Sequence, residues 1–128
     1  MDREQLVRDC WESLSRGDLA PLAAALTPDA RWRAVVEGPW NCESRAAIID
    51  VIGESIAGGL SGSVEEIDAA GPDRLIVAFR PERHDPGAWP LEDGVRHVVL
   101  SFEGDRVCEM KGCATRAAAR EYAAARPA

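Results

Sequence analysis

Apolar residues recur every three or four positions near the start of the chain, at Leu6, Val7, Cys10, Trp11 and Leu14. Because this spacing places side chains on one face of a helix, it predicts an amphipathic helix that packs on a core. Asp2 and Gln5 have the spacing of a capping box, in which the carboxylate accepts from a first-turn amide and the glutamine side chain reaches back. Gly17 is expected to end this helix, because glycine readily takes the left-handed conformation found there.

A second, shorter helix is predicted directly after this turn, with apolar positions at Leu19, Leu22, Ala23 and Leu26. Asp18 is placed to cap it, and Pro21 fits its first turn, where amides have no partner within the helix. Thr27-Pro28-Asp29 is expected to stop it. Beyond this stop, apolar and basic residues alternate from Ala30 to Val36, with Trp32 on the apolar side, which predicts a strand with one covered face.

The rest of the chain predicts one more helix, a run of strands and a final helix. The third helix runs from about Ser44 to Ile56 and ends at Gly58-Gly59. The expected strands are Val64 to Ala70, Arg74 to Arg80, Val95 to Phe102 and Arg106 to Lys111, with a tight hairpin at Gly104-Asp105. Thr115 is expected to cap an alanine-rich helix that ends near Ala125.

The segment between Pro81 and Gly94 is rich in proline and glycine and predicts a loop. Trp89 is a large aromatic residue in this otherwise polar loop. Such a ring folds back onto apolar surface, so two interpretations are open: a flap over a pocket mouth, or simple anchoring of the loop. His84, beside Asp85, fits an exposed pair of loop residues.

Composition narrows the classes of function and partner. A chain of 128 residues fits one domain, expected to span residues 1–128. The net charge of −7 opposes binding to nucleic acid and to anionic membranes, so neither partner is expected. No apolar run approaches the roughly 20 residues of a membrane span, and the charged N-terminus does not resemble a secretory signal. A cytoplasmic location is therefore the expectation.

The four cysteines, Cys10, Cys42, Cys108 and Cys113, have no CxxC spacing, so the simplest interpretation is free buried thiols. Cys42 precedes the predicted third helix, whose free amides favour a thiolate, and an activated Cys42 with Cys113 nearby is the functional alternative. A zinc site from Cys42, Cys113 and His97 is a further alternative, but no pair of these residues has the short ligand spacing typical of such sites. We therefore expect no metal and no cofactor.

The order of these elements carries a resemblance to a known fold. The chain resembles the nuclear transport factor two-like superfamily in the order of its elements. Two helices are joined by a Gly17-Asp18 elbow, Pro28-Asp29-Ala30 leads into a strand, Arg45-Ala46-Ala47-Ile48-Ile49 opens a third helix, and a long hairpin follows. The sequence is most similar to its SnoaL-like and ketosteroid-isomerase-like branch. The resemblance implies an α+β fold: a cone-shaped, curved, mostly antiparallel, cystatin-like sheet wrapped around N-terminal helices, with an internal cavity. It also implies a homodimer.

The family's catalytic positions hold other residue types in this chain. Where ketosteroid-isomerase-like proteins have a tyrosine, a base and an acid, the aligned residues are Cys10, Ala34 and Val98. The Asp-Tyr pair of the epoxide-hydrolase-like branch is matched by Gly112 and Cys113. The resemblance therefore implies a cavity but neither of these two mechanisms.

The aligned positions also imply which strand face lines the cavity: by alternation it carries Arg96, Val98, Leu100 and Phe102 on one strand of the hairpin and Cys108 and Met110 on the next. Arg96 is the charged residue of this face and could bind a carboxylate or enolate, and the alternative is an ion pair with Glu109 or Asp93. The complete set of candidate ligand-binding residues is Cys10, Leu14, Trp32, Trp40, Asn41, Cys42, Trp89, Arg96, Val98, Leu100 and Met110.

The sequence thus predicts a SnoaL-like protein that binds a small hydrophobic metabolite, and an enzyme of the isomerase, cyclase or hydrolase class is one form of this hypothesis. The alternative is a non-catalytic ligand-binding or dimerisation module. The other face of the sheet is also apolar, and we expect a monomer of this size to leave it exposed to solvent. This predicts a homodimer through the face that carries Ile76, Ala78, His97 and Val99.

Overall fold

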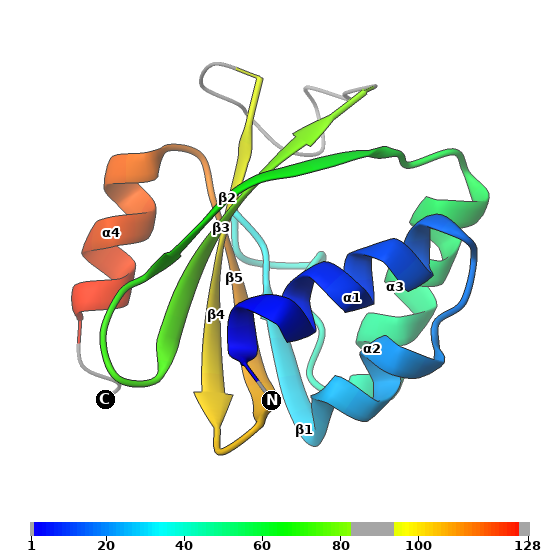
Figure 1. Ribbon diagram of the computed structural model, residues 1–128, viewed down its shortest axis with the longest axis horizontal. Coiled ribbons are helices and arrows are strands. Elements are labelled where there is room, and N and C mark those ends of the chain that lie inside the picture. The colour runs from blue at the N-terminus through cyan, green and yellow to red at the C-terminus, as the bar shows by residue number, and fades with distance from the viewer. Residues whose placement is uncertain (1, 83–93, 126–128) are drawn as a thin grey trace.

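The computed structural model describes residues 2–82 and 94–125 and contains helices on both sides of one sheet (Figure 1). The helices are α1 (Arg3–Ser15), α2 (Ala20–Ala25), α3 (Arg45–Ala57) and α4 (Arg116–Ala124). The strands are β1 (Leu26–Arg33), β2 (Gly62–Ala69), β3 (Arg74–Pro81), β4 (Arg96–Glu103) and β5 (Arg106–Cys113). All the helices and strands expected from the sequence are present. The predicted loop that holds His84 and Trp89 lies outside the described residues.

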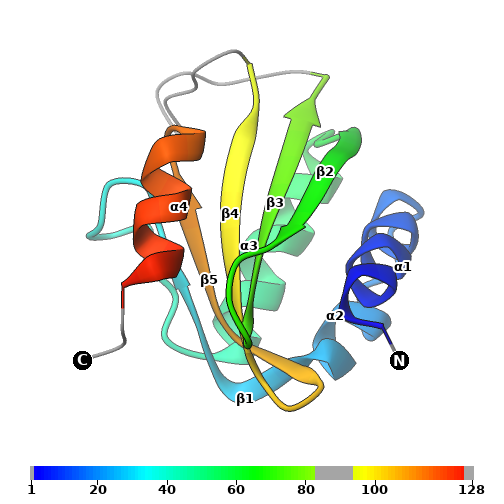
Figure 2. The ribbon, with the colours of Figure 1, turned by 60° about the vertical axis from the view of Figure 1, so that its left-hand side comes forward.

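The strands form one five-stranded sheet in the order β1-β5-β4-β3-β2. β1 runs parallel to β5, and the other neighbours are antiparallel. The sheet is curved and does not close into a barrel, which confirms the predicted α+β fold (Figures 1 and 2). Its register shifts in three places, between Leu26 and Arg31, between Val64 and Glu66, and between Ser101 and Phe102. Such irregularities bend a strand and increase its twist.

Side-chain caps set the starts of α1, α3 and α4. The carboxylate of Asp2 accepts from the Glu4 amide at 2.8 Å, so the predicted N-cap is confirmed. The second half of the capping box is wrong, because Gln5 donates to Asp9, one turn further along, instead of reaching back. Ser44 caps α3 and Thr115 caps α4. At the end of α1, Gly17 has φ +81°, as the predicted helix stop requires.

The start of β1 differs from the prediction. The strand begins at Leu26, four residues before Ala30, so Thr27-Pro28-Asp29 belongs to it. Pro28 and Asp29 are exposed at the register shift between β1 and β5, and there a proline need not donate to the ladder. The proline thus marks an irregular edge strand.

Both faces of the central strands are covered. α1, α2 and α3 lie on the inner face of the sheet, and α4 lies on the outer face (Figure 2). Leu75, Ile76, Val77 and Ala78 are consecutive residues of β3, and all four are buried. A continuous apolar run of this kind is typical of a strand that is covered on both sides.

Helix α4 packs on the face that the sequence suggested for a subunit interface. Ile76 and Val99 form a buried cluster with Cys113, Ala119 and Ala123. Ala78 and His97 are also buried within the single chain. The premise that a monomer leaves this face exposed is therefore wrong, because the small alanine side chains let α4 lie close to the sheet.

Polar contacts hold both ends of α4. Arg74, at the start of β3, donates to the carbonyl oxygens of Tyr122, Ala123 and Ala125 at 2.7–3.0 Å. The last carbonyls of a helix are poorly satisfied within it, and a cation is favourable beside them. At the other end, Arg116 forms ion pairs with Glu66 and Asp68 of β2.

The burial of Val99 gives a test of this arrangement. Its side chain is fully buried under α4, so Val99→Asp places an unpaired carboxylate in the core and is expected to cost more than about 3 kcal/mol in the free energy of unfolding. Ala117→Asp, on the exposed side of α4, should change it by less than about 0.5 kcal/mol. Urea unfolding followed by circular dichroism measures both. Equal, small effects would show that α4 does not cover this face.

Candidate functional site

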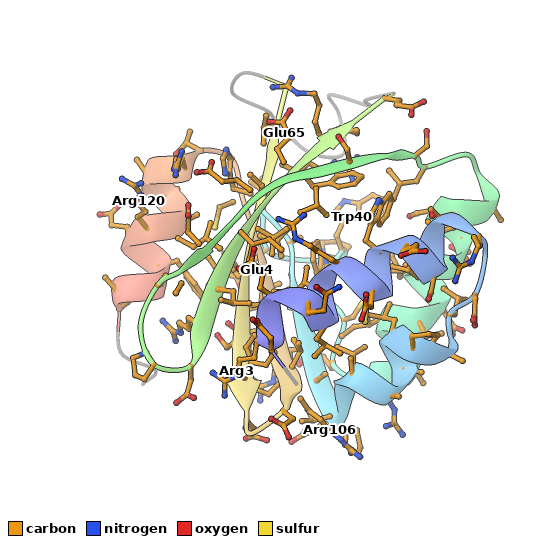
Figure 3. All side chains as sticks on the ribbon, in the orientation of Figure 1. Arg3, Glu4, Trp40, Glu65, Arg106 and Arg120 are labelled. Atoms are coloured by element: carbon orange, nitrogen blue, oxygen red, sulfur yellow. The ribbon has the colours of Figure 1, made fainter. Side chains whose placement is uncertain are left out.

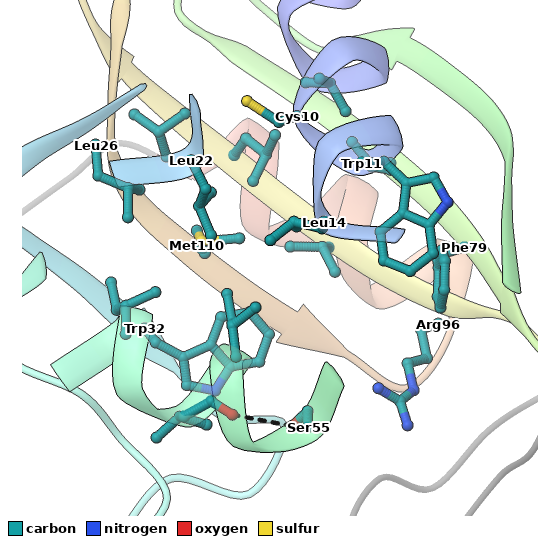
Figure 4. A pocket seen from close by; sticks show the side chains of 18 of the residues that line it. Cys10, Trp11, Leu14, Leu22, Leu26, Trp32, Ser55, Phe79, Arg96 and Met110 are labelled. Carbon is teal, nitrogen blue, oxygen red and sulfur yellow. Dashed lines mark hydrogen bonds between the residues drawn. The ribbon is translucent and has the colours of Figure 1, made fainter. Parts of the chain in front are cut away.

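A cavity of about 390 Å³ lies between the inner face of the sheet and helices α1, α2 and α3. Figure 4 shows Cys10, Trp11 and Leu14 on the α1 side, Met110 and Trp32 on the strands opposite, and Leu22 and Leu26 at one end. The periodicity of the sequence explains this arrangement. The apolar side chains of α1 share one face of the helix, and every second side chain of a strand points toward that face. A volume of this size is in the range of small-molecule sites.

Most of the candidate ligand-binding residues lie on the wall of this one cavity. They are Cys10, Leu14, Trp32, Trp40, Cys42, Arg96, Val98, Leu100 and Met110. Asn41 has another role, because its side-chain oxygen accepts from the Ala34 amide at 2.9 Å and fastens the loop to the end of β1. Trp89 lies outside the described residues.

Two residues that alternation placed on the cavity face are not among the residues lining it. The register shift between Ser101 and Phe102 turns Val107, instead of Cys108, toward the cavity. The Cys108 thiol lies 3.4 Å from the Ser101 carbonyl oxygen, on the adjacent strand. Phe102 is buried in the core, and the guanidinium of Arg3 lies over its ring.

The sequence-based candidates missed an aromatic pair on the cavity wall. Trp11 of α1 and Phe79 of β3 meet edge to face, with ring centroids 4.6 Å apart. Trp11 could have been found, because it lies on the same helical face as Cys10 and Leu14. Phe79 depends on the pairing of β3 with β4, where it stands opposite Arg96, and the sequence does not give that register.

The mouth of the cavity is marked by apolar side chains that both line it and contact solvent. Trp40 is 69% exposed and Val51 is 43% exposed, and both belong to the cavity wall. Figure 3 places Trp40 on the helix-lined side of the sheet, opposite α4 with its labelled Arg120. Trp40 thus belongs to the mouth of the cavity.

Arg96 is the only charged residue among the described residues that line the cavity. Burial lowers the pKa of its guanidinium, but arginine remains protonated in proteins. One predicted alternative, an ion pair with Glu109, is wrong. Glu109 instead pairs with Arg33 at 3.0 Å and accepts a hydrogen bond from the Tyr122 hydroxyl. The other alternative, Asp93, lies outside the described residues.

The thiols do not support the hypothesis of an activated cysteine. Burial, and then the charge of Glu43, raise the pKa of the Cys42 thiol, so Cys42 favours its neutral form. Burial and Asp9 likewise raise the pKa of Cys10. Cys113 belongs to the cluster under α4, so the structure does not bring it to Cys42 at the cavity rim. Within the residues described, no group of three His, Cys, Asp or Glu side chains could hold a metal ion.

The positions aligned with the ketosteroid-isomerase-like catalytic residues are all on the cavity wall. Cys10, Ala34 and Val98 line the cavity, and they offer apolar or thiol groups at positions where that mechanism would need an acid and a base. Gly112 and Cys113 lie at the end of β5, and neither belongs to the described wall. The wall of the cavity is therefore suited to contact a molecule through complementary shape and dispersion forces.

Comparison with solved structures shows the class of fold. A proposed polyketide cyclase from Sinorhizobium meliloti superposes with a TM-score of 0.68 at 13% identity, over 88% of this chain and 99% of that one. A cystatin-fold protein from Novosphingobium aromaticivorans gives 0.69 at 14% identity, over 88% and 97%. TerC, co-crystallised with polyporic acid, gives 0.66 at 14%, over 96% and 98%. The chain has the nuclear transport factor two-like, cystatin-like fold that the resemblance implied.

Among curated proteins, the chain is 33% identical over 93 residues to methyltransferase cfoB from Aspergillus candidus. The match covers 73% of this chain but 26% of that protein, so the chain spans about a quarter of the length of this relative. No family model matches the chain. None of the described helices combines the length and apolar character that a membrane span requires.

Tyr122 is the single tyrosine of the chain, so its titration can test whether its hydroxyl group contacts Glu109. Burial, the hydrogen bond to Glu109 and the charge of Glu109 raise the pKa of Tyr122 from 10.0 to about 12. The folded state thus holds the phenolic proton more tightly than the unfolded chain does. The stability contributed by this group is complete below pH 10 and is lost as the pH rises through about 12.

We expect the ultraviolet absorbance of the phenolate to appear with a midpoint well above 10 in the folded protein, with circular dichroism as the check on folding. Glu109→Gln should lower this midpoint, because the charge of Glu109 is removed while the burial remains. A wild-type midpoint near 10 would contradict the contact between Tyr122 and Glu109.

Proposed function

We propose that this protein is a SnoaL-like protein that binds a small hydrophobic molecule in the cavity between α1, α3 and the sheet. The observation that carries the proposal is the cavity of about 390 Å³, whose described wall is apolar except for a few groups, of which Arg96 is the charged one. Small-molecule sites are typically concave and mostly apolar, with a few polar groups that set orientation. Apolar surface at a mouth that includes Trp40 and Val51 would guide such a molecule inward.

The comparisons support this proposal at the level of fold and cavity. TerC was crystallised with polyporic acid, and the protein from Sinorhizobium meliloti is itself a proposed polyketide cyclase. Both likenesses concern the fold, because the identities are 14% and 13%. Methyl transfer does not follow from the likeness to methyltransferase cfoB, because the chain spans only about a quarter of that protein.

The proposal assigns no reaction. Cys10, Ala34 and Val98 stand where the family's isomerases hold their donors and base, and the raised pKa of Cys10 favours a neutral thiol there. An enzyme of the isomerase, cyclase or hydrolase class would have to use other groups, and a non-catalytic ligand-binding module fits the same cavity. The four cysteines form no disulfide bond with one another, which fits a reducing compartment, and we propose the cytoplasm as the location.

The neutral fluorescent probe N-phenyl-1-naphthylamine tests the binding proposal, because its emission rises in apolar surroundings. We expect saturable binding to the wild-type protein. Val98→Trp places a large side chain on the cavity wall and should weaken binding by about tenfold or more, equivalent to roughly 1.4 kcal/mol.

Val36→Trp is the matched control, because Val36 is 71% exposed and is not among the residues lining the cavity. It should bind the probe as the wild type does. The proposal fails if the wild type shows no saturable binding, or if both variants bind equally well while circular dichroism shows that they are folded.

We also propose a homodimer, which rests on the resemblance. Because α4 covers Ile76 and Val99, the contact would form over the exposed side of α4 and the neighbouring strands instead of on the bare sheet. Light scattering at micromolar concentration should give twice the 13.8 kDa mass of the chain. Arg120→Glu, an exposed change on α4, should reduce that mass, and a monomer mass for the wild type would refute the dimer.

A further inference from the structure

We propose that the cavity takes an elongated molecule with an aromatic ring at one end and a saturated hydrocarbon chain at the other, and that the chain enters first. This inference rests on the proposed function, which concerns any small hydrophobic molecule. It adds the shape of the ligand and its direction in the cavity.

The first support is the length of the cavity. Phe79 pairs with Arg96 at the start of β4, and Val107 pairs with Phe102 near its other end. Phe79 and Val107 both line the cavity. Their partners are six residues apart in β4, which corresponds to roughly 20 Å of backbone at about 3.3 Å per residue. The cavity wall therefore follows most of a strand and is suited to an elongated molecule.

The volume of the cavity agrees with such a molecule. A cavity of about 150 Å³ in another protein is large enough to bind benzene. The volume here is about 390 Å³, more than twice that size. A single ring therefore leaves room for a second segment of the ligand.

The second support is that one end of the cavity is buried and aliphatic. This closed end is formed by Leu22, Leu26 and Val107, and all three side chains are buried. Leu26 stands opposite Val107 where β1 pairs with β5, and Figure 4 shows Leu22 and Leu26 together. A polar group placed here without a partner would lose its hydration. A saturated hydrocarbon chain carries no such group and fits the closed end.

The third support is that the other end is aromatic. This aromatic end is formed by Trp11 and Phe79, which are half-buried and meet at 68° with ring centroids 4.6 Å apart. Figure 4 shows the two rings at the opposite end from Leu22 and Leu26. Aromatic side chains favour stacked or edge contacts with another ring, beyond the gain from burial alone. The ring of the ligand is therefore assigned to this end.

Exposure along the wall gives the direction of entry. The closed end is buried, whereas Trp11 and Phe79 are half-buried, and Trp40 and Ser55 are exposed members of the wall. The Ser55 hydroxyl donates to the Val51 carbonyl oxygen at 3.0 Å, which leaves its own oxygen able to accept a hydrogen bond. A polar substituent on the ring would keep contact with water or with such a group. The chain therefore lies innermost.

Three alcohols that displace N-phenyl-1-naphthylamine test the shape of the ligand. 4-Octylphenol has a linear chain, and its isomer 4-(1,1,3,3-tetramethylbutyl)phenol has the same formula with a branched chain of half the length. We expect the wild-type protein to bind the linear isomer about tenfold more tightly or better, because only the linear chain reaches the closed end. 4-Octylcyclohexanol has a saturated ring and should bind about threefold more weakly than 4-octylphenol.

A variant at each end tests the direction. Val107→Phe fills the closed end and should weaken binding of the linear isomer by about tenfold while changing that of the branched isomer by less than about twofold. Val36→Phe is the matched control, because Val36 is exposed and is not among the described lining residues, and it should keep the preference. Phe79→Leu should bind the aromatic and the saturated ring equally well and keep the preference for the linear chain.

The outcomes are distinct. If N-phenyl-1-naphthylamine does not bind the wild type, the proposed function itself fails. If it binds but the two isomers displace it equally, or the saturated ring competes as well as the aromatic one, only the present inference is overturned. It is also overturned if folded Val107→Phe keeps the preference for the linear isomer.

A second variant keeps the test decisive should Val107→Phe not fold. Leu22→Ala removes apolar contacts from the closed end and should weaken binding of the linear isomer by about fourfold or more, with little change for the branched isomer. An equal effect on both isomers would overturn the assignment of the chain to this end.

Discussion

The central strands are apolar on both faces, and this constraint shapes the whole molecule. β3 buries four consecutive residues from Leu75 to Ala78, so neither side of the sheet can be left to water. The two sides are covered differently. On the outer face, the alanines of α4 let one short helix pack directly on Val99 and Ile76. On the inner face, α1, α2 and α3 cover the curved sheet without filling all the space beneath them, and the space that remains is the cavity.

The cavity follows from this unequal covering, and its chemistry follows from the residues that the strands turn inward. Most of them are aliphatic or aromatic, so they discriminate among molecules mainly by size and shape. Arg96 differs from them, because it is the one charged side chain on the described part of the wall. The half-buried hydrogen bond between Tyr122 and Glu109 lies instead where α4 meets β5, and neither residue belongs to the described cavity wall.

Local signals in the sequence predicted the elements well, because caps and apolar periodicity act over a few residues. Asp2, Ser44 and Thr115 start their helices as expected. Alternation also placed Val98, Leu100 and Met110 on the cavity wall, but it failed at Cys108, where a shift in register reverses the facing of the side chains. The position of α4 and the meeting of Phe79 with Trp11 depend on contacts between distant segments. Neither could be predicted from local spacing.

The shifts in register also bear on how this fold can change. They occur between β1 and β5, between β4 and β5, and between β2 and β3, so the bending of the backbone is distributed over the sheet. The size of the cavity thus depends on how many residues each strand has between its paired positions, as well as on the side chains that face inward. Insertion or deletion of one residue within a strand would reverse which of the following side chains face the cavity, unless a further irregularity absorbed it. A change of one residue in strand length could therefore remodel the cavity as much as several substitutions on its wall.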